Sequence, residues 1–251
     1  MLDRMNVVLR ILLSPLTIFR FIIVILITLL LIPFLILEDF LSEKRKKEYR
    51  FIIVRIWAKS ILFVLGFIVD KNKLPSIKKY ILMPNHRGYI DIFLMGALSP
   101  SAFVAKAELL RWPLIGKALL HCKAIMVKRE ELGSLIGAMQ AIDRSIKNGI
   151  SVTLFPEGTT YEGPGTKIFK SGSFKIAAEL KVPVIPCAIS FQDPKHAWVG
   201  NDTFVPHFFR QMWKPFSKVC IRFGEPLISN DFAALKEQTK QTIDTLLKQL
   251  E

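Results

Sequence analysis

The first part of the chain is dominated by one long apolar run. Residues 21–37 read FIIVILITLLLIPFLIL and contain no charged side chain. At about 1.5 Å of helical rise per residue, this run spans about 25 Å, slightly less than the hydrocarbon core of a bilayer. The partly apolar stretch from Val7 onward lengthens it and brings in Arg10 and Arg20. We expect a membrane-inserted helix here. A signal peptide is the alternative, but the run is followed by Glu38 and Asp39 rather than by small residues.

A second apolar segment, residues 51–69, carries Arg55 and Lys59 four positions apart. That spacing places both cations on one face of a helix, which favours an amphipathic helix at the membrane interface over a second full span. A basic hinge at residues 42–48 joins the two segments, and its cations suit anionic headgroups. We therefore predict that residues 1–70 form a membrane-associated helical hairpin, with a buried helix pair of a soluble core as the alternative.

The pattern changes from Tyr80 onward, where short apolar runs of strand length alternate with helical periodicity. The runs cover residues 80–83, 102–105, 124–127, 151–155, 184–189 and 219–223. The helical patterns cover residues 91–98, 133–147, 171–180 and 231–250. This alternation predicts an α/β domain over residues 71–251, with a mostly parallel sheet flanked by helices.

The helix expected at residues 133–147 has apolar positions that suit a core-facing stripe. These are Leu135, Met139, Ile142 and Ile146. Lys147, Asn148 and Gly149 then provide the stop at its carboxyl end. We expect this stripe to pack against the sheet.

Charge indicates an anionic partner. The chain has 35 Lys and Arg residues against 21 Asp and Glu, a net charge of +14. Residues 1–50 hold eight basic and five acidic side chains, so +11 belongs to residues 51–251. Nucleic acid, an anionic membrane or a phosphorylated substrate would each fit such an excess. A nucleic-acid-binding membrane protein would need a recognisable module or basic residues interleaved with aromatics, and the sequence shows neither.

Two polar clusters directly follow expected strands, where α/β proteins place their chemistry. In the first, residues 84–91, His86 and Asp91 are five positions apart with Gly88 between them. A turn there lets the carboxylate orient the imidazole and makes His86 a general base. The alternative is a surface histidine capping a helix whose first turn holds Asp91. The second cluster covers residues 155–160.

The sequence offers no enzymic nucleophile beside this base. It contains no GxSxG, and none of Cys122, Cys187 and Cys220 follows a strand and turn near His86. A base without a protein nucleophile fits direct attack by a substrate hydroxyl. Backbone N–H groups near Gly158 are candidate donors to the resulting oxyanion.

These clusters resemble the motifs of the glycerolipid acyltransferase superfamily, whose best-known members are lysophosphatidic acid acyltransferases. The resemblance rests on Asn85-His86-xxxx-Asp91 and on Phe155-Pro156-Glu157-Gly158-Thr159. Further similar blocks follow in the family's order at residues 106–109, 112–116, 125–129 and 182–186. The match covers about residues 75–225, and the expected N-terminal hairpin also resembles family members.

The resemblance implies an O-acyltransferase of phospholipid biosynthesis in which His86 and Asp91 form the catalytic pair. It implies acceptor or substrate contacts for a wider set of positions, namely Asn85, Lys106, Arg129, Glu157, Gly158, Thr159 and Thr160. The acyl donor would be acyl-CoA or acyl carrier protein, with no metal, no bound cofactor and no nucleic-acid partner. The active site would face the cytoplasmic side of a membrane, the inner membrane if the protein is bacterial. A scaffold with the fold but without activity is the alternative.

Two departures from the family pattern bear on the acceptor. Lys123 stands where the arginine block usually has glycine, and Thr160 stands where lysophosphatidate-specific members usually have arginine. The resemblance implies 1-acyl-sn-glycerol 3-phosphate as acceptor and phosphatidic acid as product. Threonine lacks the charged fork that arginine offers to phosphate, so lyso-ornithine lipid or lysophosphatidylcholine stays as an alternative acceptor.

Overall fold

The computed structural model describes residues 12–111, 116, 119–120, 122–128 and 130–250. Its seven strands are β1 (Phe67–Lys71), β2 (Ile81–Pro84), β3 (Ser101–Lys106), β4 (Ile125–Val127), β5 (Ser151–Thr153), β6 (Val184–Phe191) and β7 (Ser217–Phe223). Its α-helices are α2 (Ser14–Ile36), α3 (Glu43–Val64), α4 (Ile90–Leu98), α6 (Leu132–Lys147), α7 (Gly172–Glu179), α8 (Phe204–Gln211) and α9 (Phe232–Lys248). Short 3-10 helices are η1 (Leu37–Phe40), η2 (Ala107–Arg111) and η3 (Pro194–His196).

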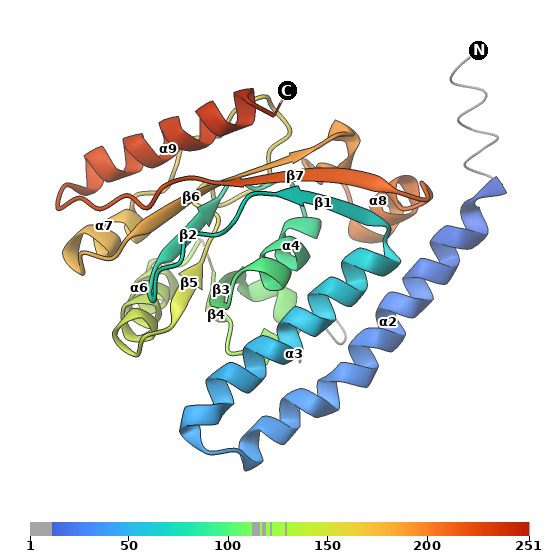
Figure 1. The fold of residues 1–251 in the computed structure, drawn as a ribbon, viewed down its shortest axis with the longest axis horizontal. Coiled ribbons are helices and arrows are strands. Elements are labelled where there is room, and N and C mark those ends of the chain that lie inside the picture. Colours follow the sequence, from blue (N-terminus) through green and yellow to red (C-terminus); the bar gives the residue numbers. More distant parts are fainter. Residues whose placement is uncertain (1–11, 112–115, 117–118, 121, 129, 251) are drawn as a thin grey trace.

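The strands form one sheet in the order β1-β7-β6-β2-β5-β3-β4 (Figure 1). Strands β6, β2, β5, β3 and β4 run parallel to one another, whereas β7 is antiparallel to β6 and parallel to β1. The prediction of a mostly parallel sheet flanked by helices is confirmed. Because parallel strands end at a common edge, the loops after β2, β3, β4, β5 and β6 meet at one side of the sheet.

Helices cover both faces of the sheet, as the two core clusters show. Leu82 and Ile185 of the sheet share one cluster with buried residues of α3, α4 and α8. Ile81, Met83 and Val184, which alternate with them along the strands, share the other cluster with α6, α7 and α9. Burial on both faces explains why these strands read as continuous apolar runs in the sequence.

The two helices of the predicted hairpin are present, but the second helix ends earlier than predicted. Helices α2 and α3 lie side by side (Figure 1), but α3 stops at Val64 and β1 follows at once. Residues 67–69, expected as helix, are therefore strand. Gly66, with φ +76°, makes the turn between them. The expected boundary at residue 70 falls inside β1, and α3 contributes Ala58, Ile61 and Leu62 to the core, joined by its C-cap Leu65.

Two further expectations need correction. Leu135 was placed on the core-facing stripe of α6, but it is 37% exposed, and the buried residues of that helix are Ala138, Ile142 and Ile146. Helix α8 was not expected, because its eight residues are too few to show a helical period against the surrounding aromatics.

Arg20 fixes α2 to the rest of the chain. Its guanidinium donates hydrogen bonds to the carbonyl oxygens of Val64 (2.9 Å), Met212 (2.9 Å), Lys214 (2.5 Å) and Pro215 (2.6 Å). The side chain is buried although it lies in the apolar helix. The opposite face of α2 is bare, with exposed Ile18, Phe19, Ile22, Leu26, Leu29, Leu30 and Phe34. Within the described residues, α2 is the one helix long and apolar enough to cross a bilayer.

Candidate active site

The candidate catalytic residues lie at the carboxyl edge of the parallel strands. The loop after β2 carries His86, and the loop after β5 carries Glu157. Strands β2 and β5 are direct neighbours, with Ile81 beside Val152 and Leu82 beside Thr153. The sheet order therefore brings together two motifs that are 71 positions apart in the chain.

His86 and Asp91 form the expected pair. The Nδ1 atom of His86 is 2.8 Å from Oδ2 of Asp91. The same oxygen accepts hydrogen bonds from the backbone N–H groups of Arg87 (2.5 Å) and Gly88 (2.8 Å). Asp91 is fully buried in the first turn of α4, whereas 15% of the His86 side chain is exposed. A carboxylate that holds Nδ1–H leaves Nε2 as the ring nitrogen that can take a proton.

Phe155 supports the imidazole from the side. Its ring stacks on that of His86 with 3.9 Å between centroids and 14° between planes. The chain then turns at Gly158, whose φ of +68° suits glycine and whose N–H donates to the Phe155 carbonyl oxygen (3.1 Å). That N–H is thus engaged in the turn, which removes it from the candidate oxyanion donors.

Glu157 holds two loops together beneath the site. Its Oε1 accepts the backbone N–H of His86 (3.0 Å), and its Oε2 accepts that of Lys167 (3.1 Å). The residue is 3% exposed. Burial raises the pKa of its carboxyl group, and the two backbone donors and the nearby Arg87 oppose that shift. Its contacts are with backbone groups, so this carboxylate orients the loop that carries His86.

Arg87 is a part of the site that the sequence did not single out. Its guanidinium donates to the carbonyl oxygens of Tyr161 (2.7 Å) and Gly165 (3.4 Å), while Tyr161 N–H donates to the His86 carbonyl oxygen (2.9 Å). Burial lowers the pKa of Arg87, and the neighbouring Glu157 and Asp91 counter this effect. The sequence shows that an arginine follows His86. It does not show the role of this arginine, because the carbonyl groups that accept its hydrogen bonds belong to residues 74 and 78 positions away.

A second loop braces the far side of residues 86–89. Trp198 N–H donates to the Arg87 carbonyl oxygen (2.8 Å), and the Trp198 Cβ lies 3.2 Å from where a Cβ on Gly88 would stand. Tyr89 bonds His207 Nδ1 through its hydroxyl (3.1 Å), and His207 Nε2 donates to Ala197 O (3.1 Å). The sequence gives His121, His196 and His207 no metal-binding spacing and predicts structural roles for them. His207 makes the contacts above, His196 Nε2 lies 3.0 Å from the Ser217 hydroxyl, and His121 lies outside the described residues.

Asn85 is fully buried and ties two strands together. Its Nδ2 donates to the Ile189 carbonyl oxygen (3.0 Å), and its Oδ1 accepts the Ile189 N–H (2.7 Å). Both polar atoms of the amide are thereby used on β6. The amide thereby fixes the end of β2, one residue before His86, and the expected substrate contact of Asn85 stays a prediction.

The remaining expected residues line the same edge. Lys106 ends β3, is exposed and lies 3.8 Å from Glu108. Thr159 is exposed and Thr160 half-buried in the turn after Glu157. Arg129 lies outside the described residues. The described members of the set therefore lie at the carboxyl edge of the sheet, at the ends of β2, β3 and β5.

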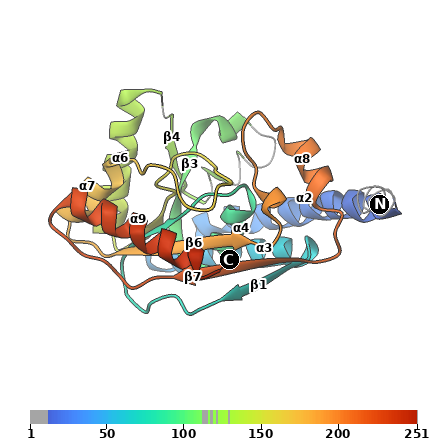
Figure 2. The same ribbon diagram turned by 90° about the horizontal axis from the view of Figure 1, so that it is seen from above.

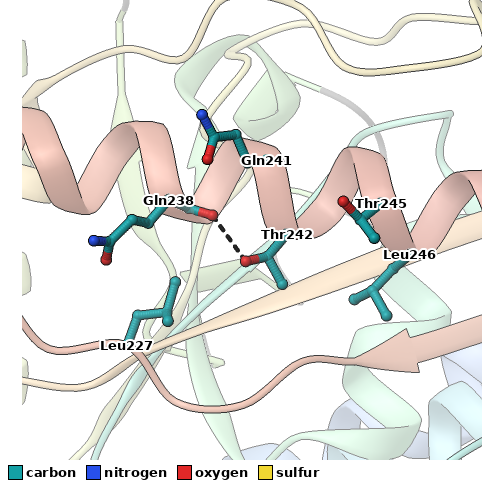
Figure 3. Close-up of a pocket in the computed structure, with 6 residues that line it drawn as sticks. All are labelled: Leu227, Gln238, Gln241, Thr242, Thr245 and Leu246. Atoms are coloured by element: carbon teal, nitrogen blue, oxygen red, sulfur yellow. Dashed lines mark hydrogen bonds between the residues drawn. The ribbon is translucent and has the colours of Figure 1, made fainter.

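Two surface hollows lie away from His86. One is lined by Leu227 and residues of α9, and its Thr242 hydroxyl is used within the helix on the Gln238 carbonyl oxygen, 2.8 Å away (Figure 3). The other, of about 880 Å³, lies between the loop at residues 192–202 and the start of β7, and its lining includes His196 and His207. Neither hollow includes His86 or Asp91 among its lining residues.

Comparison with known proteins gives the same class. Residues 67–190 match the protein-family model described as Acyltransferase. The lyso-ornithine lipid O-acyltransferase of Pseudomonas aeruginosa is 29% identical over 76% of this chain and 76% of its own. The 1-acyl-sn-glycerol-3-phosphate acyltransferase of Neisseria gonorrhoeae is 28% identical over 63% of this chain and 66% of its own. The crystal structure of the 1-acyl-sn-glycerophosphate (LPA) acyltransferase PlsC from Thermotoga maritima shares the fold, with a TM-score of 0.76 at 20% identity over 96% of this chain and 97% of that one.

The family match and these relatives identify the protein as an acyltransferase, and the His86–Asp91 pair at the carboxyl edge of the seven-stranded sheet agrees with that class. The chain belongs to the glycerolipid acyltransferase superfamily. The bare apolar face of α2 and the membrane-lipid acyltransferases among the relatives indicate that the protein associates with membranes.

Proposed function

We propose that the protein transfers a fatty acyl group from a thioester to the free hydroxyl of a lysolipid. The observation that carries this proposal is the His86–Asp91 pair, which holds Nδ1 at 2.8 Å from a fully buried carboxylate and leaves Nε2 for the acceptor. His86 would remove the hydroxyl proton as that oxygen attacks the thioester carbonyl. Asp91 would stabilise the resulting imidazolium, and the protonated His86 would return the proton to the departing thiolate.

We infer acyl-CoA or acyl carrier protein as donor, because both present a thioester next to anionic groups. Exposed lysines stand on this edge of the sheet to receive them, namely Lys106, Lys128, Lys167 and Lys170. A donor of this kind places the site on the cytoplasmic side of the membrane. Thiol release with each purified donor, in the presence of a lysolipid, tests this part of the proposal.

For the acceptor we propose 1-acyl-sn-glycerol 3-phosphate, giving phosphatidic acid. The net charge of +14 supports an anionic headgroup, and such an activity is named in the relative from Neisseria gonorrhoeae. Lyso-ornithine lipid is the second candidate, for a specific reason. The lyso-ornithine lipid O-acyltransferases of Rhizobium meliloti and Brucella abortus align with 86% and 88% of this chain, against 63% for the Neisseria gonorrhoeae protein.

The deciding experiment offers the purified protein equal amounts of both lysolipids with one labelled donor. Preferential labelling of phosphatidic acid supports the first candidate, and preferential labelling of ornithine lipid supports the second. His86→Ala protein serves as the background for each acceptor. Labelling of neither lipid, with thiol release at the level of the His86→Ala control, would favour a scaffold without activity.

A further inference from the structure

The carboxyl edge of the sheet exposes apolar side chains that the acyl transfer chemistry does not use. In α6, Leu132, Leu135 and Ile136 are 73%, 37% and 48% exposed, at the i, i+3, i+4 spacing of one helical face. Leu135 continues toward the start of α6 the stripe that is buried at Ala138, Ile142 and Ile146, and Leu132 and Ile136 lie beside it. A large apolar cluster left in water usually marks a binding surface.

The start of α6 projects from the body of the domain. A Cβ added at Gly133 or Gly137 would meet no other atom within 4 Å. Figure 2 shows this helix rising past the end of β4, the strand from which it continues. Neighbouring loops at the same edge add Leu110 after β3 and Ile168, 83% exposed, after β5. We call these five side chains the apolar rim.

Cations accompany the rim. Lys167 and Lys170 flank Ile168 on either side, and Lys128, just before α6, pairs with Glu131 at 2.8 Å. The Lys167 backbone N–H donates to the Glu157 carboxylate, which also accepts the backbone N–H of His86. The Glu157 side chain therefore connects the segment that carries Ile168 to the catalytic loop. Apolar side chains interspersed with lysines match the boundary between acyl chains and anionic headgroups.

We propose that the apolar rim inserts into the surface of an anionic bilayer and holds the catalytic edge against it. Helix α2 then provides one membrane contact and the start of α6 a second, with His86 lying between the loops of the rim. This arrangement rests on the proposed lysolipid acceptor, whose hydroxyl would reach His86 from the bilayer without leaving it. Binding of a second copy of the chain or of a carrier protein to the apolar rim would contradict this membrane contact.

Lipid contact can be measured without activity. An environment-sensitive fluorophore is attached at Leu132→Cys in a Cys122→Ser, Cys220→Ser background, in which the remaining Cys187 is fully buried. The full chain is reconstituted in vesicles of phosphatidylcholine and phosphatidylglycerol, with and without bromine on the acyl chains. We expect brominated lipid to quench this label as it quenches one at Leu30→Cys on α2. A label at Ile228→Cys, 60% exposed at the opposite edge of the sheet, should stay unquenched.

An activity measurement separates membrane contact from catalysis. The double variant Leu132→Ser, Ile136→Ser should acylate a vesicle-embedded lysolipid about tenfold more slowly, since the loss of both apolar contacts together is equivalent to roughly that factor in affinity. The same double variant should acylate a short-chain, water-soluble lysolipid at the rate of the unmodified protein. The control variant Ile228→Ser should acylate both lysolipids at the rate of the unmodified protein. Absence of quenching at position 132, or equal losses on both substrates, overturns the membrane contact. If the unmodified protein acylates no lysolipid, the proposed function fails while the quenching result still stands.

Discussion

Glu157 and His86 are joined through the backbone: Oε1 of the Glu157 carboxylate accepts the His86 N–H at 3.0 Å. Its second oxygen accepts the Lys167 N–H at 3.1 Å, so one buried carboxylate fixes the catalytic loop to the loop after β5. We therefore expect Glu157 to affect catalysis by orienting His86. Burial raises the pKa of the Glu157 carboxyl group, because the charged form is less well solvated at the buried position from which it accepts two backbone hydrogen bonds.

Replacing Glu157 with glutamine should lower kcat more than it raises the acceptor KM. The amide keeps one acceptor oxygen and turns an NH₂ group toward the other backbone N–H. The loss of a hydrogen bond to a charged group costs about 1.5–3 kcal/mol, which corresponds to a roughly 10- to 150-fold fall in kcat if the loop is displaced. Steady-state kinetics on Glu157→Gln, with exposed Glu162→Gln as the control, measure this. A rise in KM at constant kcat would instead make Glu157 a direct acceptor ligand.

The His86–Asp91 pair predicts an ordered loss of activity. His86→Ala removes the base, and general-base catalysis contributes roughly 10²- to 10⁴-fold, so turnover should fall by that factor. Asp91→Asn keeps an acceptor for the Arg87 and Gly88 N–H groups but loses the charge that stabilises the imidazolium, so it should cost less. Single-turnover acyl transfer is measured for both, with circular dichroism showing that the fold is retained. Near-normal turnover by His86→Ala would overturn the mechanism.

How far the sequence predicted this site depends on the kind of contact. Adjacent parallel strands bring together the loops after their ends, so the approach of His86 and Glu157 follows from the strand order. The role of Arg20 could not be predicted in the same way. Its acceptors are backbone carbonyls at residues 64 and 212–215, and backbone oxygens leave no trace in a residue pattern. Strand β1 was missed because its apolar residues directly continue those of α3, with Gly66 as the one interruption.

His196 should make stability depend on pH. It packs between Phe67 and Phe191, and burial lowers its pKa from 6.5 to about 4. The unfolded chain therefore binds a proton more readily than the folded one, and stability should fall by about 3 kcal/mol as the pH falls from 6.5 toward 4. His196→Phe removes the titrating group but keeps an aromatic ring. Thermal unfolding of both proteins over this pH range tests the effect, and an unchanged slope in the variant would contradict it.

Helix α2 should hold the protein on membranes by apolar burial. High salt screens surface charges, so binding through the cations near residues 44–47 alone would be lost, whereas insertion should persist. We expect vesicle sedimentation of the full chain to survive high salt and to fall in Leu26→Asp, Leu30→Asp, whose positions are 53% and 67% exposed. Deletion of residues 1–70 is unsuitable as a test, because it would also remove Ile61 and Leu65 from the core. Complete release by salt would contradict insertion.

Position 160 tests how the headgroup is selected. Thr160 follows the turn that begins at Glu157, and it stands where lysophosphatidate-specific family members usually have arginine. Arginine offers phosphate a bidentate, permanently charged fork, whereas threonine offers one neutral hydroxyl. Gaining a hydrogen bond between charged groups should contribute about 1.5–3 kcal/mol, or roughly a 10- to 150-fold shift in affinity. Thr160→Arg should therefore move the ratio of kcat/KM for lysophosphatidate over lyso-ornithine lipid upward by that factor. Thr245→Arg, the same change at an exposed position of α9, controls for the added net charge. Equal ratios in the two variants would mean that position 160 does not contact the headgroup, and that selection must come from other residues of the carboxyl edge.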